Sequence, residues 1–166
     1  MKKAFNTLFK LGLTFSVISF FFPSCTEHVV FNEYQHTPVA GWEKNDTLSF
    51  DIPPLASAGY YEEELGLRIT GSYPFMGLTL IVEQTVYPDK DKKWEKTERR
   101  DTIQCKLIDN NGATTGQGVS SYQYVFPVNM YHLDENDSVH VTIRHDMKRE
   151  ILPGITDIGL KLSHSK

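Results

Sequence analysis

Six histidines are the first residues of this sequence that could do chemistry, because imidazole is a common ligand of transition metals. His140 and His145 come closest to a pair. They lie five residues apart in a stretch with strand-like alternation, so their side chains are expected on opposite faces. The other four are scattered without metal-binding spacing: His28, His36, His132 and His164. We therefore expect no metal site and no cofactor.

Paired carboxylates are the second candidate, since two of them facing each other across a cleft could hydrolyse a glycosidic bond. The one acidic run, Glu62–Glu64, is interpreted as a solvated loop. Asp89 and Asp91 alternate with lysines, which opposes calcium binding. The sequence has no glycine-rich phosphate loop, nucleophile elbow or Cys–His signature. It therefore predicts no catalytic residues and no enzyme activity.

Aromatic and basic residues near the predicted turns form a third candidate, a binding surface. The charged segment Tyr87–Asp101 contains Trp94 and Arg99, two residue types that are enriched at the energetic centres of interfaces. Its charges could equally serve to blunt the edge of a sheet. Other aromatics flank further turns: Trp42, Tyr60, Tyr61, Tyr73 and Phe75. They could form a platform on which a glycan stacks, or they could close the ends of a hydrophobic core.

The elements that would position these residues are strands, because the apolar residues recur mainly with a period of two. Eight stretches show this alternation: Val29–Tyr34, Thr47–Ile52, Leu65–Thr70, Leu78–Tyr87, Thr102–Ile108, Tyr122–Phe126, Val139–His145 and Ile158–Leu162. Turn-forming residues separate them, and Met147–Leu152 could form at most one helical turn. One packed and one wetted face are typical of antiparallel sheets. The sequence predicts an all-β, two-sheet antiparallel sandwich with a jelly-roll-like topology.

Two of these strands carry specific expectations about burial. Cys105 shares the apolar side of its strand with Ile103 and Leu107, so we expect a buried, inert thiol rather than a nucleophile. The last stretch alternates so that Ile158, Leu160 and Leu162 face inward, which makes it a core strand close to the C-terminus.

Residues 1–24 have the character of an export signal. Lysines at positions 2, 3 and 10 precede an uncharged run, Leu11–Phe22, of 12 residues. A permanent membrane span needs about 20 apolar residues, so this run is too short to be one. We expect residues 1–24 to be removed and residues 25–166 to form a single β-sandwich domain.

The end of this segment resembles a bacterial lipobox. The small residue Ser24 directly precedes Cys25, although Phe22 stands where leucine is usual. We expect cleavage before Cys25 and attachment of lipid to that cysteine, with two or three acyl chains that give stable anchoring. Because Cys105 is the only other cysteine, a lipidated Cys25 leaves no intramolecular disulfide.

The charge of the predicted mature chain limits its partners. Loss of three lysines leaves 14 basic against 21 acidic residues, a formal charge of −7. A dispersed negative charge disfavours nucleic acid and anionic lipid surfaces. The membrane partner is therefore expected to be reached through the lipid on Cys25.

Several segments, in order and over nearly the whole mature chain, resemble the gliding-motility lipoprotein H family (GldH) of Bacteroidetes. They are VVFNEY (Val29–Tyr34), DTLSFDI (Asp46–Ile52) after a Gly-Trp pair, LRITGSYPFMGLTL (Leu67–Leu80), DTIQCKLID (Asp101–Asp109) and DMKREILPGITDIGLKL (Asp146–Leu162). The last is the most specific. The resemblance implies an envelope lipoprotein tied to gliding motility and to the secretion machinery that gliding uses, without catalytic residues.

The resulting expectation is a non-enzymatic, lipid-anchored protein of the cell envelope that contributes to an assembly with other envelope proteins. We expect the outer rather than the inner membrane, and the sequence leaves open whether the domain faces the periplasm or the cell surface. The alternative is a glycan-binding lipoprotein. It would use Trp94 and Arg99, or the pairs Tyr60/Tyr61 and Tyr73/Phe75.

Overall fold

The computed structural model describes residues 28–89 and 95–165, so the predicted signal segment, Cys25 and Trp94 lie outside the described residues. Strands make up the regular structure of these ranges, and no helix in them could span a membrane. The strands are β1 (His28–His36), β2 (Trp42–Glu43), β3 (Leu48–Ile52), β4 (Gly59–Thr70), β5 (Gly77–Tyr87), β6 (Thr97–Lys106), β7 (Gln117–Gly118), β8 (Ser121–Leu133), β9 (Ser138–His145), β10 (Ile151–Leu152) and β11 (Ile155–His164). The prediction of an all-β fold is confirmed.

Each of the eight predicted strands corresponds to one of the long strands β1, β3, β4, β5, β6, β8, β9 and β11. The main errors are at the ends. β4 begins at Gly59 rather than Leu65, and β8 continues to Leu133 rather than ending at Phe126. The suggested helical turn at Met147–Leu152 is wrong, because Ile151 and Leu152 form β10 and pair with β2.

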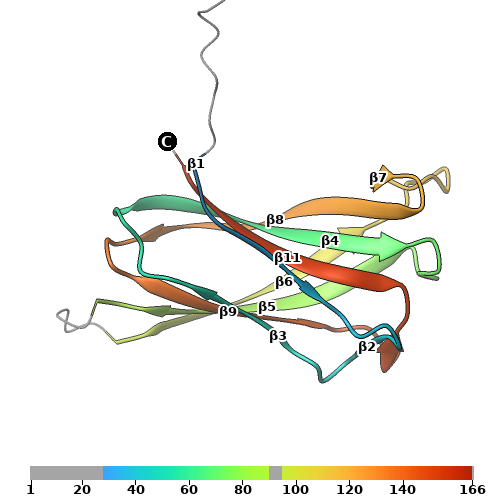
Figure 1. Cartoon of the computed structure of the whole chain (residues 1–166), viewed down its shortest axis with the longest axis horizontal. Coiled ribbons are helices and arrows are strands. Elements are labelled where there is room, and N and C mark those ends of the chain that lie inside the picture. Colours follow the sequence, from blue (N-terminus) through green and yellow to red (C-terminus); the bar gives the residue numbers. More distant parts are fainter. Residues whose placement is uncertain (1–27, 90–94, 166) are drawn as a thin grey trace, which may run out of the picture.

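The long strands form two antiparallel sheets, ordered β1-β11-β4-β8 with the short β7 at the end, and β3-β9-β5-β6. Figure 1 shows the two layers stacked face to face. Counted among the long strands, the first pairs with the eighth, the second with the seventh, the third with the sixth and the fourth with the fifth. These nested pairs describe one long hairpin rolled across two sheets, which is a jelly roll. The predicted topology is confirmed.

The core fills the space between the sheets with the inward half of each alternation. β11 lies between β1 and β4, and its Ile158, Leu160 and Leu162 have no exposed surface. The prediction that this terminal segment is a core strand is therefore confirmed. Cys105 is 2% exposed, as its strand period predicted.

The outer face of the first sheet brings together three of the segments that carry the family resemblance. Tyr34 of β1 lies across Gly159 of β11 and Gly66 of β4, where a Cβ at position 159 would stand 2.6 Å from the tyrosine ring. The guanidinium of Arg68 lies over the same ring, 4.0 Å from its centroid. The glycines are therefore needed for a close approach between the ring and the backbone, and these motif residues have a packing role.

Both lateral sides of the sandwich lie between strands that do not pair with each other in the described residues. Where β1 faces β3, the Gln35 side chain donates a hydrogen bond to the Ser49 carbonyl. In the part of the chain that the structure describes, β6 pairs only with β5, and the two-residue β7 meets β8 only at Tyr122 and Gln123. Where β6 faces β8, both strands are therefore edges for most of their length. Side-chain hydrogen bonds link the two sheets on that side.

Candidate functional site

The predicted binding residues that can be placed lie apart from one another. Arg99 is exposed on β6, and its guanidinium stands 5.0 Å from the centroid of the Tyr131 ring. Tyr60 is 59% exposed and meets His132 edge-on, whereas its neighbour Tyr61 is buried. Trp94 lies outside the described residues.

The remaining aromatics occupy the opposite end of the sandwich. Tyr73 is buried, Phe75 is half-buried, and their rings meet at 71° rather than lying in one plane. Trp42 has no exposed surface. Among the residues that the structure describes, the predicted aromatics therefore do not form a single exposed strip on which a glycan could stack.

The acidic run Glu62–Glu64 is not a solvated loop, so that interpretation was wrong. All three residues belong to β4, where side chains alternate between the two faces. Glu64 faces outward and pairs with Lys161 at 2.9 Å, whereas Glu63 faces the core and has no exposed surface. A carboxyl group in that position is rare unless it has partners.

Glu63 belongs to a polar cluster that crosses from one sheet to the other. The side-chain amide of Gln84, on β5, donates to Oε2 of Glu63 at 2.9 Å and to Oδ2 of Asp101, on β6, at 3.1 Å. Asn129, on β8, donates to the same Asp101 oxygen at 3.3 Å. Four strands thus contribute one residue each to the Glu63 cluster, which comprises Glu63, Gln84, Asp101 and Asn129.

The electrostatics of the Glu63 cluster favour a neutral Glu63. Burial raises the pKa of Glu63 to about 7; the negative charge of Asp101 also raises it, while the hydrogen bond from Gln84 and the charge of Arg99 oppose the shift. Three buried polar atoms of the region have no hydrogen-bond partner: Oε1 of Glu63, Oε1 of Gln84 and the hydroxyl oxygen of Tyr131.

Two carboxyl groups therefore approach each other, which is the arrangement that a hydrolase of the paired-carboxylate kind would need. The second requirement, access for a substrate, is not met. Glu63 is fully enclosed between the sheets, and Gln84, which joins the two carboxyls, is 1% exposed. The geometry describes a polar group inside a core rather than an active-site cleft.

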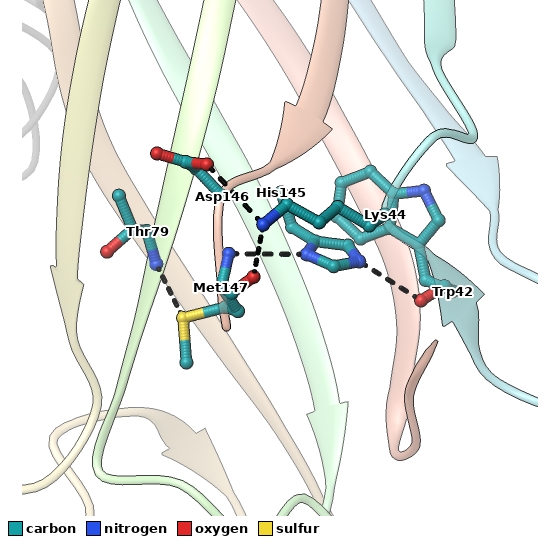
Figure 2. Close-up of polar contacts among 6 residues, drawn as sticks. All are labelled: Trp42, Lys44, Thr79, His145, Asp146 and Met147. Atoms are coloured by element: carbon teal, nitrogen blue, oxygen red, sulfur yellow. Dashed lines mark hydrogen bonds and ion pairs between the residues drawn. The ribbon is translucent and has the colours of Figure 1, made fainter. Parts of the chain in front are cut away.

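A second buried polar group lies at the other end of the sandwich, where β9 ends. His145 has no exposed surface, and its ring meets that of Trp42 edge-on at 5.3 Å between centroids. Its Nε2 lies 3.2 Å from the Trp42 carbonyl oxygen, and the Met147 amide donates to Nδ1 at 3.4 Å (Figure 2). Both bonds are made at once only when the hydrogen is on Nε2, so the ring is a neutral imidazole.

The residues around His145 hold this corner in place. Lys44 donates to the Met147 carbonyl at 2.9 Å and pairs with Asp146 at 3.9 Å, and the Thr79 amide contacts the Met147 sulfur at 3.4 Å (Figure 2). Burial lowers the pKa of His145, and the positive charge of Lys44 lowers it further. We refer to His145, Trp42, Lys44 and Met147 as the His145 corner.

The sequence also raised the questions of a metal site among the histidines and of a nucleophile at Cys105. In the described part of the chain, no group of three or more His, Cys, Asp or Glu side chains is arranged to hold a metal ion. His140 faces outward and pairs with Asp51 at 2.6 Å, so it lies on the opposite face from His145, as predicted. Burial raises the pKa of Cys105 to about 12, which keeps it a thiol at neutral pH.

Comparison with known proteins gives this all-β domain a family. The family model described as GldH lipoprotein matches residues 29–162, and the chain belongs to that family. It is 28% identical over 149 residues to the gliding motility lipoprotein GldH of Flavobacterium johnsoniae, covering 84% of this chain and 87% of that protein. The predicted resemblance is confirmed, and the family is one of lipoproteins.

Similarity to solved structures is distant. An aminopeptidase from a Thaumarchaeota archaeon aligns with a TM-score of 0.35 and 9% identity over 87% of this chain, which spans 32% of that protein. A CocE/NonD family hydrolase from Staphylococcus aureus gives 0.41 and 8%, covering 84% of this chain and 34% of the hydrolase. A family 35 carbohydrate binding module from Clostridium thermocellum gives 0.33 and 10%, covering 84% and 98%. None of these likenesses bears on activity.

Proposed function

We propose that this protein is a non-enzymatic lipoprotein that is anchored through lipid on Cys25 and contributes to a protein assembly of the cell envelope linked to gliding or secretion. The observation that carries this proposal is the match to the GldH lipoprotein family over residues 29–162. The relative in Flavobacterium johnsoniae is named for gliding motility. The buried position of Glu63, His145 and Cys105 supports a non-catalytic role, because a substrate in solution could not reach these reactive side chains.

The position of β1 supports a domain that is held close to the membrane. β1 begins at His28, three residues after Cys25. Fully extended, three residues span at most about 11 Å. A lipid on Cys25 would therefore keep the end of the sandwich that carries His28 within reach of the bilayer surface.

The test of the anchor is a Cys25→Ser variant followed through membrane fractionation. We expect the wild-type protein in the membrane fraction, on the outer membrane after density separation, and the variant either uncleaved or in the soluble fraction. Normal processing of the variant together with stable membrane association would contradict the anchor.

The test of the assembly is chemical crosslinking in intact cells followed by purification of the lipidated chain. We expect it to recover specific envelope proteins that are absent when the Cys25→Ser variant is the bait at equal abundance. Recovery of the same proteins with both baits would show that association does not depend on the anchor. Recovery of none would contradict a role in an assembly.

A further inference from the structure

The Glu63 cluster lies at the side of the sandwich where β6 faces β8. Asn129 of β8 donates to Asp101 of β6, and Gln84 of β5 donates to Glu63 of β4. Arg99 of β6 covers the ring of Tyr131 of β8. No strand pairing crosses between these two edges in the described residues, so these side-chain contacts and the packing around them hold β6 against the first sheet.

The unpartnered atoms of the cluster indicate where a proton belongs. Gln84 and Glu63 are joined on one side by the 2.9 Å hydrogen bond from Nε2 to Oε2, while Oε1 of each is buried without a donor. Two unsatisfied buried acceptors cost free energy. A carboxylic acid, unlike a carboxylate, has an O–H that can donate. A proton on Oε1 of Glu63 would give this carboxyl a donor, and Oε1 of Gln84, on the side chain that already bonds to Oε2, is a buried acceptor without one.

We propose that Glu63 is held as a neutral carboxylic acid in the closed sandwich, and that loss of its proton loosens β6 from the β8 side. Ionised Glu63 would place a second negative charge next to Asp101, with the amide nitrogen of Gln84 shared between them. The strand that can yield is β6, because it is an edge strand whose one partner among the described strands is β5.

The groups that face Glu63 from the neighbouring strands act in opposite directions. From β6, the Asp101 charge favours the protonated form and the Arg99 charge opposes it. From β5, the hydrogen bond of Gln84 also opposes it. The two residues that face Glu63 from β8 are uncharged. Asn129 is an amide, and burial raises the pKa of Tyr131 further above neutrality. On the β11 side, the register partner of Glu63 is the buried, apolar Leu162.

The direction of the pH effect follows from the two states of Glu63. In the closed state its pKa is about 7, and once β6 loosens and water enters, it returns toward the ordinary value of 4.5. Between these values the closed state holds a proton that the open state has released. Opening should therefore become roughly tenfold more favourable for each pH unit across this window and level off above it.

The experiment measures amide hydrogen exchange of the full lipidated chain in detergent at several pH values, with each rate divided by that of the unfolded chain at the same pH. We expect the protection of β6 to fall roughly tenfold per pH unit between pH 5 and about 7, then to become constant. β3, the other edge of the same sheet, is the internal control and should keep its protection.

Two variants and one spectroscopic signal complete the test. Glu63→Gln retains a donor toward Gln84 and should abolish the pH dependence of β6, while Asp101→Asn should move the plateau to lower pH. If Glu63→Gln does not fold, the wild type still decides: its infrared spectrum should contain a protonated-carboxyl band at pH 6 that is gone at pH 8. The absence of that band at pH 6, or a β6 slope that survives in Glu63→Gln, would overturn the proposal.

Discussion

The Glu63 cluster and the His145 corner are two solutions to burying a titratable side chain in one core. Both residues lie in phase with the apolar face of their strands and have no exposed surface. At His145, each ring nitrogen has a partner, and the neutral imidazole completes the geometry. At Glu63, one oxygen has a partner and the other has none. The two buried side chains therefore differ in how many of their polar atoms have hydrogen-bond partners, and not in their burial.

The two regions also respond to pH with opposite signs. Glu63 has a folded pKa raised to about 7, so its contribution to stability is complete below 4.5 and is lost as the pH rises to about 7. His145 has a folded pKa lowered from 6.5, so its contribution is complete above 6.5 and is lost as the pH falls toward the folded value. As the pH falls just below 6.5, the two effects oppose each other.

The largest effect is expected from His145→Ala. It removes a fully packed ring and leaves the Trp42 carbonyl and the Met147 amide without partners. The free energy of unfolding should fall by about 3–5 kcal/mol, from the cavity together with the unsatisfied groups. Urea unfolding measures it. His140→Ala on the same strand is the matched control, and its exposed pair with Asp51 should cost under about 1 kcal/mol. Equal losses in the two variants would contradict the structural role of the corner.

A double-mutant cycle at Glu63 and Gln84 should distinguish the two regions most clearly. Gln84→Leu alone leaves Glu63 buried without its donor and should cost about 2–4 kcal/mol of unfolding free energy. Glu63→Leu combined with Gln84→Leu replaces both polar groups with apolar ones and should recover most of that loss. If the double variant were less stable than Gln84→Leu alone, the cluster would be as indispensable to the fold as the His145 corner.

Glu63→Gln should separate the pH response from the packing. From pH 4.5 to pH 8, the wild type should lose about 2–3 kcal/mol of unfolding free energy relative to the variant. The reason is that the variant has no carboxyl proton to lose at position 63. Urea unfolding at both pH values provides the measurement. Glu62→Gln, at the adjacent outward position of β4, should show no comparable change. Parallel pH profiles for wild type and Glu63→Gln would refute the assignment.

Lys44→Met should give the smallest effect and act on the other region. The methionine keeps the apolar stem but removes the bond to the Met147 carbonyl and the charge that faces His145. The cost should be about 1 kcal/mol, as for a single partly exposed hydrogen bond. The pKa of His145 should move upward, which a nuclear magnetic resonance titration of the ring protons would report. An unmoved titration would show that burial alone sets that pKa.

Strand periodicity could predict most of this fold because each long strand keeps one apolar and one polar face. The same periodicity contains the positions of the cluster. Glu63 precedes Leu65 by two residues, Gln84 lies between Val82 and Val86, and Asp101 precedes Ile103 by two. Each is therefore placed inward by its own strand. A polar residue at an inward position interrupts the apolar pattern that marks a strand. For this reason the sequence predicts a start of β4 at Leu65 rather than at Gly59.

The contacts themselves could not be predicted, because they depend on which strands become neighbours. Gln84 meets a glutamate 21 residues earlier, and Asn129 meets an aspartate 28 residues earlier, across two sheets. Likewise, alternation placed His145 inward, yet its partner is the Trp42 carbonyl, 103 residues away. Local pattern fixes the face of a side chain, whereas the strand order fixes its partner.

The nested pairing of the strands also dictates an order of events during synthesis. β1, the first of the described strands, has β11, the last of them, as its only sheet partner in the described residues, and β11 also separates β1 from β4. The first sheet therefore cannot close until β11 has appeared, although the β5–β6 hairpin can pair as soon as it is made. Closing so long a loop is slow. Until then, the edges of β1 and β4 remain open to wrong pairing.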